Sequence, residues 1–105
     1  MIKNCILVFD IGKTNQKYFL FDANYSLIRQ GNKKTQKTID DDGDTCDDIE
    51  KMTSWIKKVF YEYLNSNKYK ITKVNFSAFG ATFVHLDSSF KIIKPVYDYN
   101  KKIDE

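Results

Sequence analysis

The feature that most constrains the fold is a pair of apolar runs joined by a short polar turn near the start of the 105-residue sequence. Cys5–Phe9 is rich in Ile, Leu and Val, and a continuous run of this kind predicts a strand buried on both faces. Lys17–Phe21 predicts a second strand, and the residues between them, "DIGKTNQ", predict a tight turn around Gly12. The chain should therefore open with two antiparallel strands.

Further periodic segments follow this pair. Asp22–Ser26 has the composition of a turn, and a third strand begins at Ser26–Gln30, which completes an antiparallel meander. A helix is predicted over Asp47–Asn65, where apolar residues recur at three- and four-residue steps. The core-facing stripe comprises Ile49, Met52, Ile56, Val59, Phe60 and Tyr63, widened by Trp55 and Leu64. We interpret Trp55 as a packing residue.

The last third of the chain predicts one more strand and a hairpin. Val74, Phe76 and Ala78 alternate with polar residues, which predicts a strand from near Lys73 to Gly80. The stretches "ATFVHLD" and "KIIKPVYDY" flank a "DSSF" turn and predict a hairpin. His85 alternates with Phe83 and is interpreted as a surface or edge-strand residue.

The acidic segment Asp40–Asp48 predicts a loop. An EF-hand with Gly43 as its required glycine would need ligands at Thr38 and Ile49, and neither can supply the carboxylate. The acids instead suit a helix N-terminus, and Thr45 with Asp48 approximates a capping box. This acidic run and the lysine run Lys33–Lys37 are both interpreted as solvated surface.

Composition excludes several classes of function. The net charge of +3, from 17 basic and 14 acidic residues, is too small to indicate a nucleic-acid partner. The apolar stretch before Asp10 is too short for a signal peptide or a membrane span. Cys5 and Cys46 form no disulfide framework or metal motif, and two reduced thiols favour a cytoplasmic protein.

The first turn carries the most chemistry. Gly12 permits backbone conformations forbidden to other residues, and successive N–H groups from Gly12 to Thr14 can form an anion-binding concavity. Lys13 and Thr14 add side-chain donors for phosphate oxygens. Asp10 becomes useful at such a site if Mg²⁺ lies between its carboxylate and the phosphate.

The stretch "FDIGKTNQKYFLFD" resembles the first phosphate loop of the actin, hexokinase and heat-shock-protein ATPase superfamily. More narrowly, it resembles the FGGY carbohydrate kinases, which open with Asp-x-Gly-[Thr/Lys]-Thr-[Asn/Ser] and a strand ending Phe-Asp. The stretch "VNFSAFGATFVHLDSSFKIIKPVYDYN" is similar to the family's substrate loop, in the manner of its rhamnulokinase-like and fuculokinase-like branch. The resemblance covers nearly all 105 residues but only the first part of a typical member.

The resemblance implies a fold and a set of site residues. It implies an α/β, ribonuclease H-like (actin-like ATPase) domain, of which residues 1–105 form an incomplete portion. It implies ATP and Mg²⁺ as cofactors, with a phosphate loop of Asp10, Gly12, Lys13, Thr14 and Asn15 in which Asp10 holds Mg²⁺ through water. It implies that Phe79, Gly80, Ala81 and Thr82 line a sugar pocket; the family's rhamnulokinases tend to have Asp where this chain has Thr82. Asp98 falls in a Pro-x-x-x-Asp-like region of the family.

The family transfers the γ-phosphoryl group of ATP to a hydroxyl of a sugar such as a ketose. Its catalytic Asp and adenine-binding glycines lie beyond residue 105, so the isolated chain should be inactive. Because an incomplete domain leaves apolar surface and an open edge, we expect that surface to bind a second copy or the remainder of the kinase.

Two other functions fit the predicted elements. A ribonuclease H-like nuclease would use Asp10 and Glu50 as metal ligands, but its fourth strand should end in an acid and here ends "NFSAFG". A non-catalytic binding or assembly module derived from a kinase remains the alternative.

Overall fold

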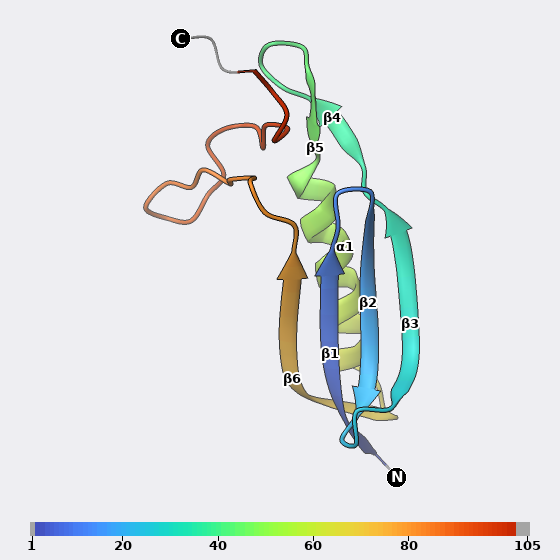
Figure 1. Cartoon of the computed structure of the whole chain (residues 1–105). Helices are drawn as coiled ribbons and strands as arrows, with labels where there is room; N and C mark the ends of the chain where they lie inside the picture. Colours follow the sequence, from blue (N-terminus) through green and yellow to red (C-terminus); the bar gives the residue numbers. More distant parts are fainter. Residues whose placement is uncertain (1, 103–105) are drawn as a thin grey trace.

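The computed structural model describes residues 2–102, so residues 1 and 103–105 of the predicted 1–105 span lie outside the described residues. The chain forms a mixed α/β structure in which every predicted strand of the meander, the helix and the following strand are present (Figure 1). The elements are β1 (Lys3–Ile11), β2 (Asn15–Asp22), β3 (Leu27–Lys34), β4 (Lys37–Ile39), β5 (Thr45–Asp47), α1 (Ile49–Leu64) and β6 (Tyr69–Ala78).

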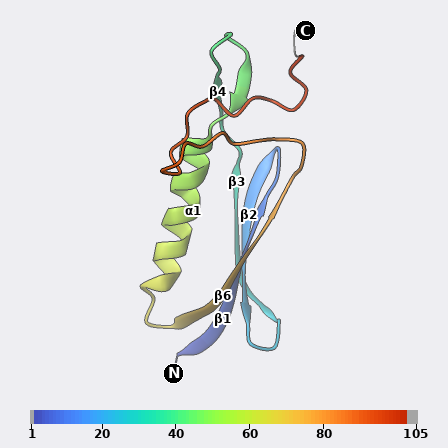
Figure 2. The ribbon, with the colours of Figure 1, turned by 90° about the vertical axis from the view of Figure 1, so that its left-hand side faces the viewer.

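Four of the strands form one sheet in the order β3-β2-β1-β6. β1 pairs antiparallel with β2 and parallel with β6, and α1 provides the crossover between β5 and β6. The helix lies against one face of this sheet, and no other layer within residues 2–102 covers the opposite face (Figure 2). β4 and β5 form a separate two-stranded hairpin beyond the β1–β2 turn (Figure 1).

The core lies between α1 and the sheet. Leu7, Phe9 and Leu20 are fully buried, and the ring of Trp55 meets the ring of Phe9 edge-on at 6.1 Å. The remaining core side chains are Cys5, Ile11, Met52, Val59 and Tyr63. The predicted helical stripe and the packing role of Trp55 are therefore confirmed, except that Leu64 is half exposed at the end of the helix. No helix within residues 2–102 has the length and apolarity needed to cross a membrane.

The prediction that β1 is buried on both faces is wrong for the described residues. Burial alternates along the strand: Leu7 and Phe9 are buried under α1, whereas Val8 and Asp10 are only partly buried. The expected open edge is not at β1, because β6 pairs with β1 in parallel; the far edge of β6 is open within residues 2–102. The run Cys5–Phe9 is continuously apolar because β1 has apolar residues both on the face that α1 covers and on the opposite face.

Several predicted boundaries also differ. The acidic segment is not all loop, because β4 and β5 pair across Asp40–Asp44. The helix N-cap is Asp48, whose carboxylate accepts a hydrogen bond from the Lys51 N–H at 3.0 Å, so the predicted Thr45 capping box is wrong. Thr45 pairs with Ile39 instead. The predicted final hairpin reduces to a single bridge between Leu86 and Ile92.

Gly31 in β3 makes room for an aromatic cluster on the helix side. The Tyr18 hydroxyl lies 2.9 Å from the Tyr63 hydroxyl, and the Tyr18 ring packs 6.2 Å from that of Trp55. A Cβ atom at Gly31 would lie 2.2 Å from Cε1 of Tyr18. Because Tyr63 and Trp55 hold the Tyr18 ring, the ring cannot move away freely from such an atom.

We therefore expect Gly31→Ala to lower the free energy of unfolding by about 1–3 kcal/mol, through overpacking against Tyr18. Urea denaturation followed by the fluorescence of Trp55 measures the change. Gly80→Ala is the matched control, because a Cβ there meets no atom within 4 Å. Equal stability of the two variants would contradict the packing argument.

Candidate functional site

The turn between β1 and β2 is closed by a backbone hydrogen bond from the Gly12 N–H to the Asn15 carbonyl at 2.8 Å. A Cβ at Gly12 would lie 2.6 Å from that same carbonyl oxygen, so no larger residue fits without opening the turn. Gly12 does not have a positive φ angle, and the predicted reason for a glycine here is wrong. The turn needs glycine for space.

Residues after β3 hold the turn from one side. The buried Thr35 donates its N–H to the Thr14 carbonyl at 2.8 Å and its hydroxyl to the Gly12 carbonyl at 3.1 Å. Lys37 Nζ approaches the Lys13 carbonyl at 3.4 Å. Since a trans peptide places each N–H opposite the preceding carbonyl, the N–H groups of Lys13 and Thr14 are directed away from these partners. Such an orientation suits the predicted anion-binding turn for Lys13 and Thr14. The prediction that the Gly12 N–H also binds the anion is wrong, because that group donates to the Asn15 carbonyl.

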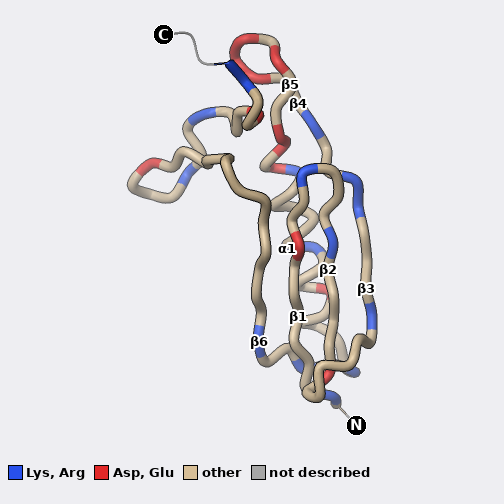
Figure 3. Tube along the Cα trace, viewed as in Figure 1, with Lys and Arg blue, Asp and Glu red and all other residues tan. Residues whose placement is uncertain are grey.

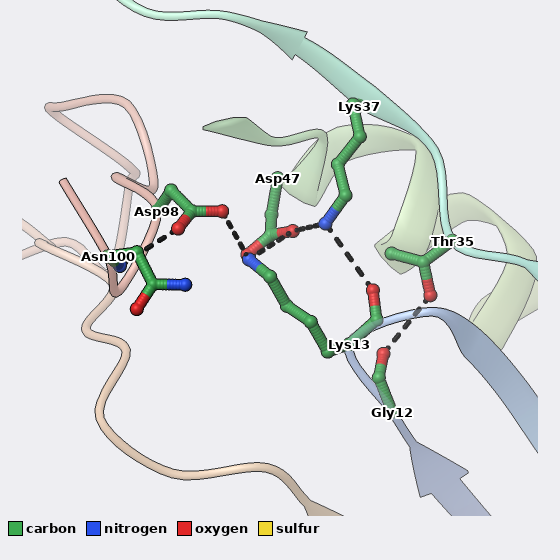
Figure 4. Close-up of polar contacts among 7 residues, drawn as sticks. All are labelled: Gly12, Lys13, Thr35, Lys37, Asp47, Asp98 and Asn100. Atoms are coloured by element: carbon green, nitrogen blue, oxygen red, sulfur yellow. Dashed lines mark hydrogen bonds and ion pairs between the residues drawn. The ribbon is translucent and has the colours of Figure 1, made fainter. Parts of the chain in front are cut away.

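The Lys13 side chain links the turn to two distant segments (Figure 4). Its Nζ lies 2.7 Å from Oδ2 of Asp98 and 3.3 Å from Oδ2 of Asp47. Lys37 Nζ pairs with the other oxygen of Asp47. The Asp47 side chain is 1% exposed, so the two ammonium groups neutralise a buried carboxylate.

Contacts within this cluster shift the pKa values of Lys13 and Asp98. The hydrogen bond from Lys13 and that from the Asn100 N–H lower the pKa of Asp98. Desolvation lowers the pKa of Lys13, but its hydrogen bond to Asp98 and the charge of Asp47 outweigh this effect and raise it. The Lys13–Asp98 pair therefore stays ionised over the whole neutral range.

Two aromatic rings lie close to the same ammonium group. Lys13 Nζ lies 4.8 Å from the ring centroid of Tyr99 and 5.5 Å from that of Phe79. The Phe79 N–H donates to the Ile11 carbonyl at 3.1 Å, which places the segment after β6 beside the β1–β2 turn. The structure thus brings together the predicted phosphate residue Lys13, the predicted pocket residue Phe79 and Asp98.

A pocket of about 590 Å³ lies next to this cluster. The predicted residues Ala81 and Thr82 line it together with His85, Tyr97 and Asp98, whereas Phe79 and Gly80 are not part of its lining. The hydroxyl oxygen of Thr82 is buried without a hydrogen-bond partner. Ala81 adopts a φ of 59°, a strained left-handed conformation for a non-glycine residue.

Asp10 lies near the end of β1 on the sheet face opposite α1, between the buried Phe9 and Ile11. In register it faces Lys17 of β2 and Ser77 of β6. Its side chain is partly exposed, Thr14 is exposed, and a returning strand follows Asn15. This placement leaves the Asp10 carboxylate accessible to a hydrated cation, while its role in holding Mg²⁺ stays a prediction.

Sequence reasoning missed the residues that hold the site together. Thr35, Lys37 and Asp47 fall in charged or polar runs that were interpreted as solvated surface. No repeating pattern in the sequence identifies Asp47, which lies one residue before the N-cap of α1.

The acidic run also has a structural role. Lys101 Nζ lies among the carboxylates of Asp40, Asp42 and Asp44, at 2.9 Å from Asp42 and 3.1 Å from Asp44. Figure 3 shows basic positions of the C-terminal segment beside the acidic loop between β4 and β5. The hydrogen bond from Lys101 lowers the pKa of Asp40. The acidic turn therefore clamps the segment that carries Asp98 and Tyr99.

The fold matches parts of solved carbohydrate kinases. A carbohydrate kinase from Novosphingobium aromaticivorans superposes with a TM-score of 0.82 at 22% identity, over 100% of this chain and 21% of that chain. Gluconate kinase from Lactobacillus acidophilus gives 0.72 at 18% identity, over 90% and 19%. Glycerol kinase from Plasmodium falciparum, solved with ADP, gives 0.63 at 20% identity, over 90% and 20%.

These likenesses establish the fold, and the structural resemblance to carbohydrate kinases stated from the sequence is confirmed at that level. The chain spans about a fifth of the length of each enzyme, at 19% to 21%. No protein-family model and no curated protein matches the sequence.

The ion pair predicts a pH dependence of stability. Because the folded pKa of Asp98 is depressed, its stabilising effect is present above the unfolded value of about 3.9 and is lost as the pH falls through the folded pKa. We expect the melting temperature of the wild type to exceed that of Asp98→Asn at pH 6, and this difference to shrink below about pH 4. Melting curves from pH 7 to 2 measure it.

The control is the same comparison in a Lys13→Met background. There the partner charge is gone, so Asp98→Asn should change the melting temperature by an amount that varies far less with pH. A pH-dependent difference of equal size in both backgrounds would assign the effect to a group other than Lys13.

Proposed function

We propose that this chain is the N-terminal part of an FGGY-type sugar kinase, which transfers the γ-phosphoryl group of ATP to a carbohydrate hydroxyl. In this proposal the chain supplies the phosphate loop and part of the sugar pocket. The observation that carries it is the contact of Lys13, from the β1–β2 turn, with Asp98 at the edge of the pocket. Phosphoryl transfer needs its two reactants side by side, and here the two predicted sites adjoin.

The sheet topology supports the same reading. Three antiparallel strands, a helical crossover and a parallel strand beside β1 are the elements expected at the start of a ribonuclease H-like domain. A nuclease of that fold is disfavoured because β6 leads into Phe79 and Gly80 rather than into an acid.

The residues of the turn fit a magnesium-bound polyphosphate. The N–H groups of Lys13 and Thr14 and the Thr14 hydroxyl are proposed to donate to phosphate oxygens, with Asn15 closing the turn through Gly12. Asp10 is proposed to hold Mg²⁺ through water, which would neutralise the repulsion between its carboxylate and the phosphates. A partly exposed carboxylate near a strand end suits such a hydrated ion.

The pocket fits a polyhydroxylated ligand of the ketose class. The unpartnered Thr82 hydroxyl supplies a hydrogen-bond partner that the fold leaves unused, and Asp98 adds a carboxylate to the same lining. Phe79 and Gly80 are proposed to support the loop rather than to line the pocket. The base that activates the sugar hydroxyl is proposed to come from residues outside this segment, so these 105 residues alone are expected to have no kinase turnover.

The uncovered sheet face is the proposed contact with the rest of the kinase. It carries Ile6, Val8 and Phe21 around an apolar hollow of about 620 Å³. Lysines protect the β3 edge at Lys33 and Lys34. At the open β6 edge, Val74 and Phe76 are exposed on the helix side of the sheet, where they pair with Leu7 and Phe9 of β1. In the solved kinases the matching segment is about a fifth of a longer chain, so a further part of the enzyme is the fitting occupant.

The phosphate site is tested by titrating the chain with magnesium tripolyphosphate in a calorimeter. We expect binding that depends on Mg²⁺ and is weakened about tenfold or more in Asp10→Asn and Thr14→Val, since each removes one charge-assisted contact. Asp87→Asn, in the distant "DSSF" turn, is the control and should bind as wild type does. Equal affinity in wild type and Asp10→Asn would remove the support for a phosphate site.

The uncovered face predicts self-association when these residues are alone, because a second copy is the available cover for apolar surface. Sedimentation velocity at micromolar concentration should show a dimer or larger species. Val8→Lys places a charge in the centre of the face and should shift the chain towards monomer, with circular dichroism to verify its fold. Phe90→Lys alters an 83% exposed phenylalanine in a remote turn and should not. A monodisperse wild-type monomer would argue against this surface.

A further inference from the structure

The ammonium group of Lys13 has two carboxylate partners whose surroundings differ. Asp47 is 1% exposed, and its N–H donates to the Val96 carbonyl at 3.3 Å. Asp98 is 26% exposed and lies in the pocket lining. One partner is therefore buried and fixed, while the other faces the space proposed for the sugar.

Departure of Lys13 would have different consequences for the two carboxylates. Asp47 would remain paired, because Lys37 also contacts it. Asp98 would keep only the hydrogen bond from the Asn100 N–H at 2.9 Å to its Oδ1 and would expose Oδ2 to the pocket. Lys13 can thus move without leaving a buried charge unpaired, a loss that costs far more than that of an exposed pair.

We propose that Lys13 switches between Asp98 and a phosphate bound at the β1–β2 turn, so that filling the phosphate site frees the Asp98 carboxylate to accept a hydrogen bond from a sugar hydroxyl. The inference rests on the proposed function, since it concerns the two ligands named there. A polyphosphate carries several negative charges and competes for the ammonium group against the single charge of Asp98.

Two aromatic rings attract the ammonium group beside Asp98. Tyr99 and Phe79 contact each other, with ring centroids 6.3 Å apart, and lie 4.8 and 5.5 Å from Nζ. Their faces attract the cation without fixing one direction. Coupling of this kind is reciprocal, so a hydroxyl bound to Asp98 also releases Lys13 towards the phosphate site. The pocket and the turn then bind their ligands with positive cooperativity.

Hydrogen exchange of the chain, with and without magnesium tripolyphosphate, tests the switch. Peptides covering residues 11–16 should gain protection when the probe binds. Peptides covering residues 96–101 should exchange about two- to fivefold faster, the equivalent of losing one surface ion pair. The Lys101 N–H, which donates to the Asp98 carbonyl at 2.9 Å, reports directly on this turn.

Two variants separate the switch from a general effect of the probe. Asp98→Asn keeps Lys13, so the probe should still protect residues 11–16 while residues 96–101, already fast, should not respond. Lys13→Met should show the same fast exchange at residues 96–101 without the probe. Lys91 is an exposed lysine directly after the "DSSF" turn, and Lys91→Met should behave as wild type.

A double-mutant cycle gives a second measurement. Asp98→Asn should bind the probe about two- to fivefold more tightly than wild type, because it no longer holds Lys13 back. In a Lys13→Met background the same substitution should change the affinity much less. An equal gain in both backgrounds would mean that Asp98 merely repels the anion, and it would overturn the switch.

The outcomes distinguish this inference from the function on which it rests. Protection at residues 11–16 with no change at residues 96–101 in wild type overturns the switch and leaves the phosphate site standing. No protection at residues 11–16 at saturating probe overturns both.

Discussion

The buried carboxylate of Asp47 is the constraint around which the upper end of the molecule is arranged. A charge with 1% exposure needs partners, and it obtains them from Lys13 in the first turn and Lys37 in β4. Its backbone N–H also donates to the Val96 carbonyl, which places the last segment beside the same point. Three segments distant in sequence therefore meet because one acid at the end of β5 has to be neutralised. The proposed phosphate turn and the pocket adjoin as a result of that requirement.

The lower part of the molecule is held by different forces. Between α1 and the sheet the contacts are apolar and aromatic, with Phe9 stacked on Phe76 at 5.1 Å and the Tyr18 and Tyr63 hydroxyls 2.9 Å apart. Burial of this kind is insensitive to charge, whereas the upper end depends on ion pairs and on the Lys101 clamp. A change of pH or salt should therefore loosen the site before it affects the core. Such a division suits a protein in which the site adjusts to ligands while the apolar core keeps its structure.

The sequence predicted the elements whose apolar residues repeat, since the period of a strand or helix follows from which face is buried. It predicted the start of β6 poorly for a physical reason. The register shifts between Cys5 and Ile6, so that Thr72 interrupts the alternation and hides the first residues of the strand. β4 and β5 have three residues each and little apolar character, so no period reveals them. Asp10, Lys13 and Thr82 were found from a motif, but Asp47 and Thr35 act through contacts that arise only once the chain has folded.

The apolar residues on the two faces of β1 have different explanations. Leu7 and Phe9 are explained by the helix above them, but Val8 and Phe21 are apolar on a face that nothing covers within residues 2–102. In a sheet with one face exposed to solvent, apolar and polar residues alternate along each strand. Apolar residues on both faces of the same strand do not fit such a sheet. Their presence suits a mixed sheet that is covered on both faces. The same residues that leave this segment with an exposed apolar face are therefore consistent with the proposal that it is part of a larger kinase.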